Sequence, residues 1–210
     1  MILIGQYDSP FVRRVAIALR LYGFDYEHRP WSVWADADAL AMLNPLRRVP
    51  TLVLDDGEVL IESAAILDAL DQMVGPDRAL IPSSGAARRR ALKVCALATG
   101  LADKAVSLFY EGLLHEAPSQ TWTDRCHAQI ADVLTSLEAE RPAGDGWWLG
   151  ETLGHPDIAA ACALRFTREA HPGVFAQAPW PKLAAHSERC ERLEVFQAIC
   201  QPLTVALKNA

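Results

Sequence analysis

The sequence changes character near residue 80, and this change constrains the fold more than any other feature. Before it, short runs with strand periodicity alternate with runs of helical periodicity, which is typical of an α/β unit. The expected order is strand, helix, strand, helix, two hairpin strands and helix, over residues 2–4, 11–21, 24–29, 36–43, 51–54, 59–61 and 63–74. Asp55-Asp56-Gly57 supplies the hairpin turn, and Ser63 is expected to cap the last helix.

Residues 75–86 separate the two parts, because they are rich in Gly, Pro and Ser, as linkers are. Apolar residues then recur every three or four positions, which predicts helices throughout the second part. Examples of this spacing are Val94, Leu97, Ala98 and Leu101. The predicted fold class is therefore α/β plus all-α, with domains at residues 1–78 and 86–210.

The charge balance narrows the range of partners. The chain has 20 Lys and Arg against 26 Asp and Glu, a formal net charge of −6. This acidic balance argues against a nucleic-acid partner, because general nucleic-acid binders present a basic face. No apolar run approaches the ~20 residues that cross a bilayer, and the N-terminal residues lack the positive region of a signal peptide. We therefore expect no membrane association and a cytoplasmic location.

The cysteines and histidines show no metal or disulfide pattern. The five cysteines are odd in number, form no Cys-x-x-Cys pair, and all fall in segments that are predicted to be helical: Cys95, Cys126, Cys162, Cys190 and Cys200. We expect buried, reduced thiols, as in a reducing compartment. The six His residues lack the spacing of metal ligands, so no metal is expected.

Four short segments carry signals for binding or capping. Ser9-Pro10 opens the first helix, and Glu62-Ser63 opens the last helix of the α/β part. Helix N-termini favour anions, since their first N–H groups point outward. Val49-Pro50 precedes the first hairpin strand. Asp157 is expected at the third position of a helix that starts near His155, where a carboxylate bonds the N–H of the capping residue.

Together with the order of the two parts, these segments resemble the cytosolic glutathione S-transferases, including bacterial members, over essentially the whole chain. Ser9-Pro10-Phe11-Val12-Arg13-Arg14 is similar to the Cys-Pro-Phe-x-x-Arg segment of omega-type members, with Ser in place of Cys. Serine is also the active residue of the theta and zeta classes. The resemblance implies a thioredoxin-like N-terminal domain that binds glutathione, followed by an all-helical domain.

The resemblance also implies how glutathione is held. Pro50 is expected to follow a cis peptide bond, and the main chain of Val49 is expected to pair with the cysteinyl main chain of glutathione. Glu62 and Ser63 would hold the γ-glutamyl group, whose ammonium and carboxylate suit a carboxylate and a helix N-terminus. Arg48 is the candidate for the glycyl carboxylate because it lies beside Val49.

Ser9 is the candidate catalytic residue, because its hydroxyl and the adjacent N–H groups would stabilise the thiolate of glutathione. Tyr7 stays open as an alternative, since a tyrosine near this strand end supplies the hydroxyl in some classes. Glutathione is then a co-substrate, and no metal takes part. The predicted activity is conjugation of the thiolate to an apolar electrophile, expected between the domains, with a role in detoxification.

The alternative function is a non-catalytic ligand-binding or regulatory protein on the same scaffold. Thiol-disulfide exchange is disfavoured, because Ser9 cannot form a mixed disulfide. The family resemblance further implies a homodimer. Acidic Asp68 and Asp71 on one helix and the basic run Arg88-Arg89-Arg90 on the next are opposite in sign, as a two-fold contact between copies requires.

Overall fold

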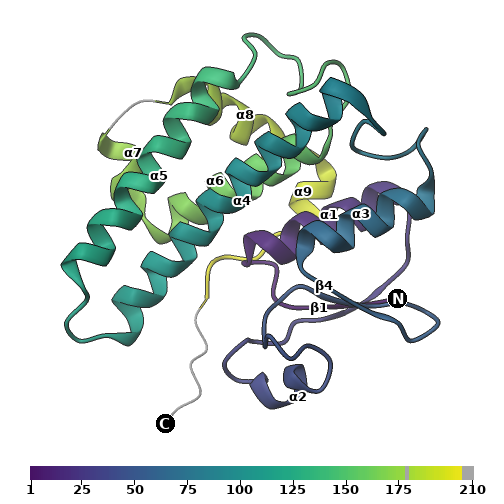
Figure 1. Cartoon of the computed structure of the whole chain (residues 1–210), viewed down its shortest axis with the longest axis horizontal. Coiled ribbons are helices and arrows are strands. Elements are labelled where there is room, and N and C mark those ends of the chain that lie inside the picture. The colour runs from purple at the N-terminus through teal and green to yellow at the C-terminus, as the bar shows by residue number, and fades with distance from the viewer. Residues whose placement is uncertain (178–179, 205–210) are drawn as a thin grey trace. The chain divides into compact units, whose positions relative to one another are not determined.

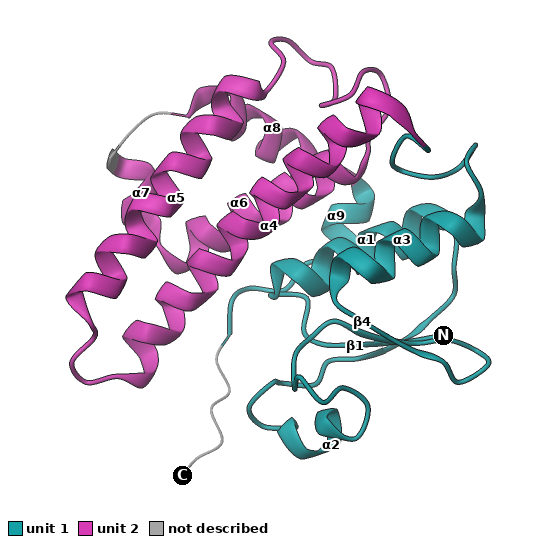
Figure 2. Cartoon of the chain, in the orientation of Figure 1, with its two compact units in different colours: residues 1–83, 194–210 teal, residues 84–193 magenta. Residues whose placement is uncertain are grey.

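A computed structural model describes residues 1–177 and 180–204 of the chain (Figure 1). These residues form two compact units, coloured separately in Figure 2. Unit 1 comprises residues 1–83 with the described residues from Glu194 on, and unit 2 comprises residues 84–193. Within the described ranges, no helix combines the length and apolar character that a membrane crossing requires.

Unit 1 contains a four-stranded mixed sheet. Its strand order is β2-β1-β3-β4, and the strands are β1 (Ile2–Ile4), β2 (Glu27–Arg29), β3 (Thr51–Val53) and β4 (Val59–Ile61). The strands β1 and β2 are parallel, whereas β3 is antiparallel to both β1 and β4. A parallel pair needs a crossover connection, and the helix after β1 supplies it.

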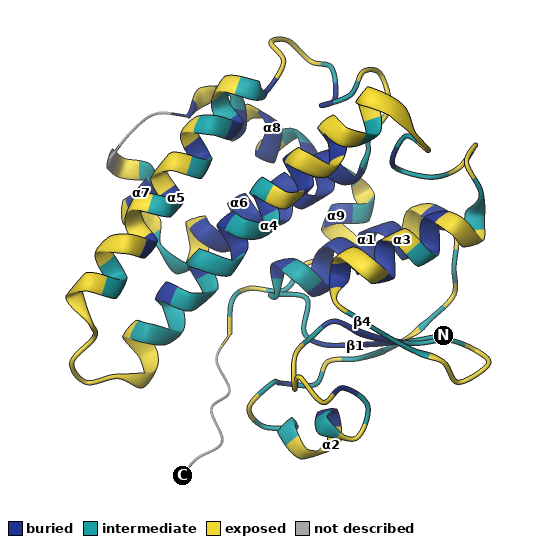
Figure 3. Cartoon of the chain, in the orientation of Figure 1, coloured by how far each residue is buried: buried dark blue, intermediate teal, exposed yellow. Residues whose placement is uncertain are grey.

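Helices α1 (Pro10–Tyr22) and α3 (Ser63–Val74) lie together on one side of this sheet, and the short α2 (Ala37–Ala41) lies on the other (Figure 1). Every residue of α1 from Val12 to Leu19 is buried, so this part of the helix has no exposed face (Figure 3). Gly23 ends the helix at φ 76°, a left-handed conformation that glycine adopts without steric cost.

Unit 2 is a bundle around one central helix. The bundle contains α4 (Gly85–Leu114), α5 (Gln120–Glu140), α6 (His155–Ala170), α7 (Pro172–Gln177) and α8 (Pro181–Glu191). Every residue of α6 from His155 to Leu164 is buried, and α4, α7 and α8 all contact it. The mixed α/β fold of unit 1, thioredoxin-like, and the all-helical fold of unit 2 confirm the predicted fold class.

The cap of α6 is built as predicted. The Oδ2 atom of Asp157 accepts the N–H of Gly154 at 3.0 Å, and its Oδ1 accepts the N–H of Trp148 at 2.8 Å. Asp157 is fully buried, and this burial raises the pKa of its carboxyl group. The imidazole of His186 lies 3.2 Å from the backbone oxygen of Asp157, and burial lowers the pKa of His186 to about 4. The capping carboxylate therefore also fixes the loop before α6.

The chain after α8 differs from the predicted division at residues 1–78 and 86–210. Helix α9 (Glu194–Ala198) belongs with unit 1, where it contacts α1. The cause is Arg13 of α1, a charged residue that is only 2% exposed. Its guanidinium donates to the backbone oxygens of Phe196 and Ile199, so the last segment is bound to the α/β unit.

Three further expectations need correction. Cys200 is exposed and lies beyond the last helix, whereas Cys95, Cys126, Cys162 and Cys190 are buried as predicted. Asp71 is buried, and its carboxylate accepts hydrogen bonds from the Tyr22 hydroxyl and, at 3.1 Å, from the N–H of Leu80. Asp71 is therefore not part of an acidic surface. Ser63 is the first residue of α3, and Glu62 occupies the capping position instead.

Candidate functional site

The register of the sheet brings the predicted site segments to one edge. Ile4 at the end of β1 pairs with Thr51 at the start of β3, and Thr51 pairs with Ile61 at the end of β4. Three segments join the sheet next to these paired residues: the loop that leads to Ser9, the Val49-Pro50 segment and the Glu62-Ser63 segment. Residues separated by more than fifty positions thus share one end of the sheet.

The loop after β1 packs directly on the Val49 segment. Gly5 has φ 126°, and a Cβ atom added to it would lie 2.5 Å from Cγ2 of Val12 and 2.8 Å from Cβ of Val49. A side chain at position 5 would therefore displace one of these two residues. The N–H of Gly5 donates to the backbone oxygen of Arg29 at 2.9 Å, which fixes the start of the loop on β2.

Ser9 lies at the junction of this loop with α1. Its backbone is extended (φ −64°, ψ 124°), and its Oγ accepts the N–H of Val12 at 3.4 Å, while Pro10 begins the helix. The bond to Val12 is long, and the O–H of Ser9 can donate to a ligand at the same time. The N-terminal end of α1 adds positive potential at this point.

Val49 and Pro50 are joined by a cis peptide bond, as the family resemblance implied. The fully buried Asn44 holds the segment around them: its Nδ2 donates to the backbone oxygen of Arg48 at 2.9 Å and to Oγ1 of Thr51 at 3.2 Å. Asn44 thus fixes the chain on both sides of the cis bond.

Glu62 and Ser63 form the start of α3. Glu62 has φ 64°, a left-handed conformation that is costly for a residue with a side chain and that tends to occur at functional sites. Its carboxylate lies 3.5 Å from the guanidinium of Arg48, and both side chains are about half exposed. Ser63 is only 5% exposed. The structure therefore brings together Arg48 and Glu62, two residues that were predicted to contact opposite ends of glutathione.

Tyr7, the alternative source of the hydroxyl, is engaged elsewhere. Its hydroxyl lies 2.9 Å from the hydroxyl of Tyr26, and its ring stacks on His28 with centroids 3.8 Å apart. The pKa of the Tyr7 hydroxyl is raised well above its usual value, mainly by burial and secondly by the hydrogen bond to Tyr26. Tyr7 thus joins the loop to β2 and the residues before it.

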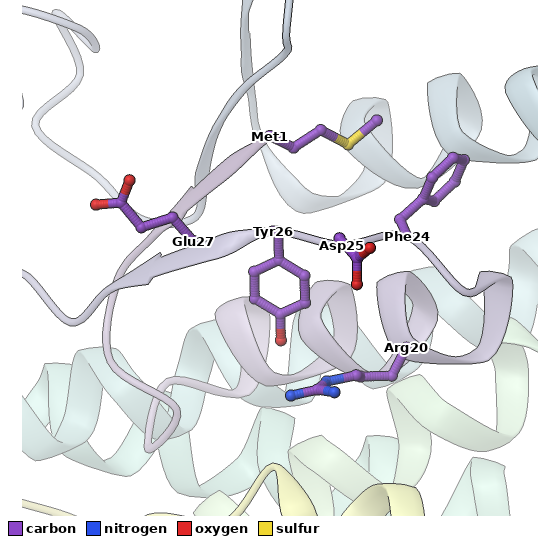
Figure 4. A pocket seen from close by; sticks show the side chains of 6 residues that line it. All are labelled: Met1, Arg20, Phe24, Asp25, Tyr26 and Glu27. Carbon is purple, nitrogen blue, oxygen red and sulfur yellow. The ribbon is translucent and has the colours of Figure 1, made fainter.

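Tyr26 also lines a pocket of about 360 Å³ on the surface of unit 1, shown in Figure 4. The guanidinium of Arg20 lies 5.8 Å from the centre of the Tyr26 ring. None of the predicted glutathione residues lines this pocket, so it is separate from the candidate site. In the described part of the chain, no group of three or more His, Cys, Asp or Glu side chains has the geometry of a metal site.

Comparison with known proteins shows the family to which this chain belongs. Residues 3–78 match the N-terminal domain model of the glutathione S-transferases, and residues 120–189 match the C-terminal domain model. The chain is 31% identical over 183 residues to the uncharacterized GST-like protein YibF of Escherichia coli, which covers 85% of this chain and 89% of that protein. The protein therefore belongs to the glutathione S-transferase family.

Two solved structures are similar over nearly the whole chain. A glutathione S-transferase of Methylobacterium radiotolerans, in complex with glutathione sulfonate, has a TM-score of 0.88 and 28% identity over 98% of both chains. A family member of Pseudomonas fluorescens with bound glutathione has a TM-score of 0.82 and 32% identity, covering 96% of this chain and 99% of that one. Both of these relatives bind glutathione or a glutathione derivative.

Proposed function

We propose that this protein is a glutathione S-transferase that conjugates the glutathione thiolate to an apolar electrophile in the cytoplasm. One observation carries the proposal: the Ser9 junction, the cis Val49–Pro50 bond and the Glu62-Ser63 helix start leave the sheet at the same end. The glutathione bound in the Pseudomonas fluorescens structure and the glutathione sulfonate bound in the Methylobacterium radiotolerans structure support the choice of ligand.

The proposed binding mode uses both ends of the tripeptide. The γ-glutamyl carboxylate accepts hydrogen bonds from Ser63 and the N-terminal N–H groups of α3, and its ammonium contacts Glu62. The cysteinyl main chain pairs with Val49. Arg48 leaves its half-exposed contact with Glu62 and binds the glycyl carboxylate, which costs little because exposed ion pairs are weak.

The proposed chemistry is ionisation of the bound thiol. A thiol with a pKa of about 8.5 is only ~3% thiolate at pH 7. A pKa lowered by ~2 units makes most of the thiol ionised and corresponds to about 2.7 kcal/mol of preferential stabilisation of the thiolate. The O–H of Ser9 and the positive end of α1 supply this stabilisation, because both favour the charged sulfur. The thiolate then attacks the electrophilic carbon and displaces its leaving group or adds to its double bond.

Ser9 is preferred to Tyr7 as the donor. The Tyr7 hydroxyl is paired with the hydroxyl of Tyr26, whereas Ser9 Oγ accepts a long hydrogen bond from the N–H of Val12, which leaves its own proton to donate. The proton of the Ser9 hydroxyl is thus the one that is placed to reach a ligand at the end of α1.

Binding of the γ-glutamyl group gives the first test. Ser63→Ala and Glu62→Ala should each weaken glutathione binding in calorimetry by about 10- to 150-fold, the loss expected for a hydrogen bond to a charged group. The exposed Ser83 and Glu58 offer matched controls, and Ser83→Ala and Glu58→Ala should bind as the wild type does. Unchanged affinity in both Ser63→Ala and Glu62→Ala would remove the γ-glutamyl group from this site.

We further propose a two-fold homodimer formed through α3 and α4. The exposed Asp68 on α3 and the exposed Arg89 and Arg90 on α4 have opposite charges, as an isologous contact requires. Met73 on α3 and Leu92 on α4 are 49% and 47% exposed, so apolar side chains accompany the charges. Light scattering at micromolar concentration should give twice the chain mass of 23.0 kDa, and a mass of 23.0 kDa would contradict the dimer.

A further inference from the structure

Residues 199–204 form a C-terminal strap that is hydrogen-bonded to the loop of residues 5–9, which ends at Ser9. Figure 1 shows the yellow strap passing the N-terminal end of α1. The N–H of Tyr7 donates to Oε1 of Gln201 at 3.1 Å. The Oδ2 atom of Asp8 accepts the backbone N–H of Thr204 at 3.1 Å and its hydroxyl at 3.2 Å. The two residues immediately before Ser9 are thus held by residues more than 190 positions away.

Arg13 fixes the direction in which the strap leaves α9. Its Nε donates to the backbone oxygen of Ile199 at 2.8 Å, and its Nη2 donates to that of Phe196 at 3.0 Å. The guanidinium carbon also lies 5.4 Å from the centre of the Phe196 ring. A cation suits the last carbonyl groups of a helix, which carry partial negative charge. Since Arg13 belongs to α1, the strap is anchored to the same helix that Ser9 caps.

The strap adds to the support that the loop receives from β2 through Gly5 and the ring of Tyr7. Gly5 is bonded to β2, and the N–H of Ser9 donates to the backbone oxygen of Gln6 at 3.2 Å. Between these points, Gln201 of the strap accepts a hydrogen bond from the N–H of Tyr7, and Thr204 of the strap donates one to the carboxylate of Asp8. The position of the Ser9 hydroxyl therefore depends on the strap as well as on the cap of α1.

We propose that Gln201 and Thr204 are positioning residues of the catalytic junction. This inference rests on the proposed function. Gln201 fixes the backbone that precedes Ser9, and a shift of about 1 Å in such a group costs up to about 100-fold in rate. Thr204 holds the carboxylate of Asp8 on the strap. A carboxylate that turned toward the thiolate would raise the pKa of the thiol, because like charges disfavour ionisation.

Three variants test this inference. Gln201→Leu removes the acceptor and keeps the size of the side chain, Thr204→Val removes the hydroxyl, and Thr204→Ser keeps it. The exposed Thr135 of α5, whose hydroxyl donates to the backbone oxygen of Ala131, gives the control Thr135→Val in unit 2. Two kinds of measurement serve as readouts. The absorption of the thiolate gives the pKa of the bound glutathione thiol, and steady-state kinetics give kcat and the KM for glutathione.

Gln201→Leu should raise the pKa of the bound thiol by about one unit and lower kcat about tenfold, which corresponds to ~1.4 kcal/mol. Thr204→Val should shift both quantities in the same direction. The KM for glutathione should change less than twofold, since the γ-glutamyl contacts at Glu62 and Ser63 are intact. Thr204→Ser and Thr135→Val should match the wild type. If Gln201→Leu and Thr204→Val both keep the wild-type thiol pKa and kcat, the strap has no positioning role.

Hydrogen exchange at the Tyr7 amide separates this inference from the proposed function. If the wild type does not ionise glutathione, the proposed function is wrong. The exchange rate of the Tyr7 amide then still tests whether the strap holds the loop. Gln201→Leu should speed exchange at Tyr7 about tenfold, because the amide loses its acceptor. An unchanged rate would overturn the inference that the strap holds this loop.

Discussion

Ser9→Ala should lower the rate of conjugation about 10- to 150-fold, because one hydrogen bond to a charged group is worth roughly 1.5–3 kcal/mol. The same change should raise the pKa of the bound glutathione thiol, since the thiolate loses the O–H donor at the end of α1. The affinity for glutathione should change much less, because its γ-glutamyl and cysteinyl main-chain contacts do not involve Ser9. Steady-state kinetics with a chromogenic aryl halide, together with calorimetry, measure the three quantities.

Tyr7→Phe is the matched control for Ser9→Ala. It removes the hydroxyl that is paired with Tyr26 and leaves the ring stacked on His28, so its kcat should stay within about threefold of the wild type. Ser9→Cys should add thiol-transfer activity at the expense of conjugation, because a cysteine can form a mixed disulfide. A full conjugation rate in Ser9→Ala with a loss in Tyr7→Phe would make Tyr7 the catalytic hydroxyl.

Asp157→Ala should destabilise the protein by about 2–5 kcal/mol. The carboxylate accepts two backbone N–H groups, of Trp148 and Gly154, and each buried donor left without an acceptor costs roughly 1–3 kcal/mol. For a chain of this length, such a loss corresponds to a fall in Tm of roughly 5–15 °C. Thermal unfolding followed by circular dichroism measures it.

Asp124→Ala is the control for the loss of a carboxylate. Asp124 is exposed on α5, and its carboxylate accepts a hydrogen bond from the side chain of Gln120. The control should change the stability by less than about 0.5 kcal/mol, as surface substitutions do. Equal melting temperatures for Asp157→Ala and the wild type would show that the buried cap does not hold the loop before α6.

The elements of the α/β unit were predictable where periodicity and turn residues agree. The prediction of a strand at residues 2–4, a hairpin around Asp55-Asp56-Gly57 and a helix over 63–74 is confirmed. The strand predicted at 24–29 is confirmed only for Glu27–Arg29. Its partner β1 has three residues, so only three residues of the neighbouring strand find a partner, whatever the alternation before them.

Long-range partners account for what the sequence could not supply. Arg13 and Asp71 are charged residues, yet each is buried because its partners come from other segments of the chain. The guanidinium of Arg13 bonds the backbone oxygens of Phe196 in α9 and of Ile199 just after it. The carboxylate of Asp71 bonds Tyr22 and Leu80. Nothing in the local sequence indicates these contacts. The bonds from Gln201 and Thr204 to the Ser9 loop were missed for the same reason.

The candidate site was predictable only through motifs. Helix periodicity and turn chemistry locate Ser9-Pro10 and Glu62-Ser63 at helix starts, whereas the cis bond before Pro50 came from the resemblance alone. The positive φ of Glu62 has no sequence signal of its own, because backbone strain appears only once the chain is folded. The roles of Ser9, Arg48, Val49, Glu62 and Ser63 remain predictions.

The pKa of glutathione bound to the wild-type protein tests the central claim most directly. A pH titration of thiolate absorption at saturating glutathione should give an apparent pKa about two units below the value of ~8.5 for an ordinary thiol. A pKa near 8.5 for bound glutathione would contradict a catalytic junction at Ser9 and favour a non-catalytic ligand-binding protein on this scaffold.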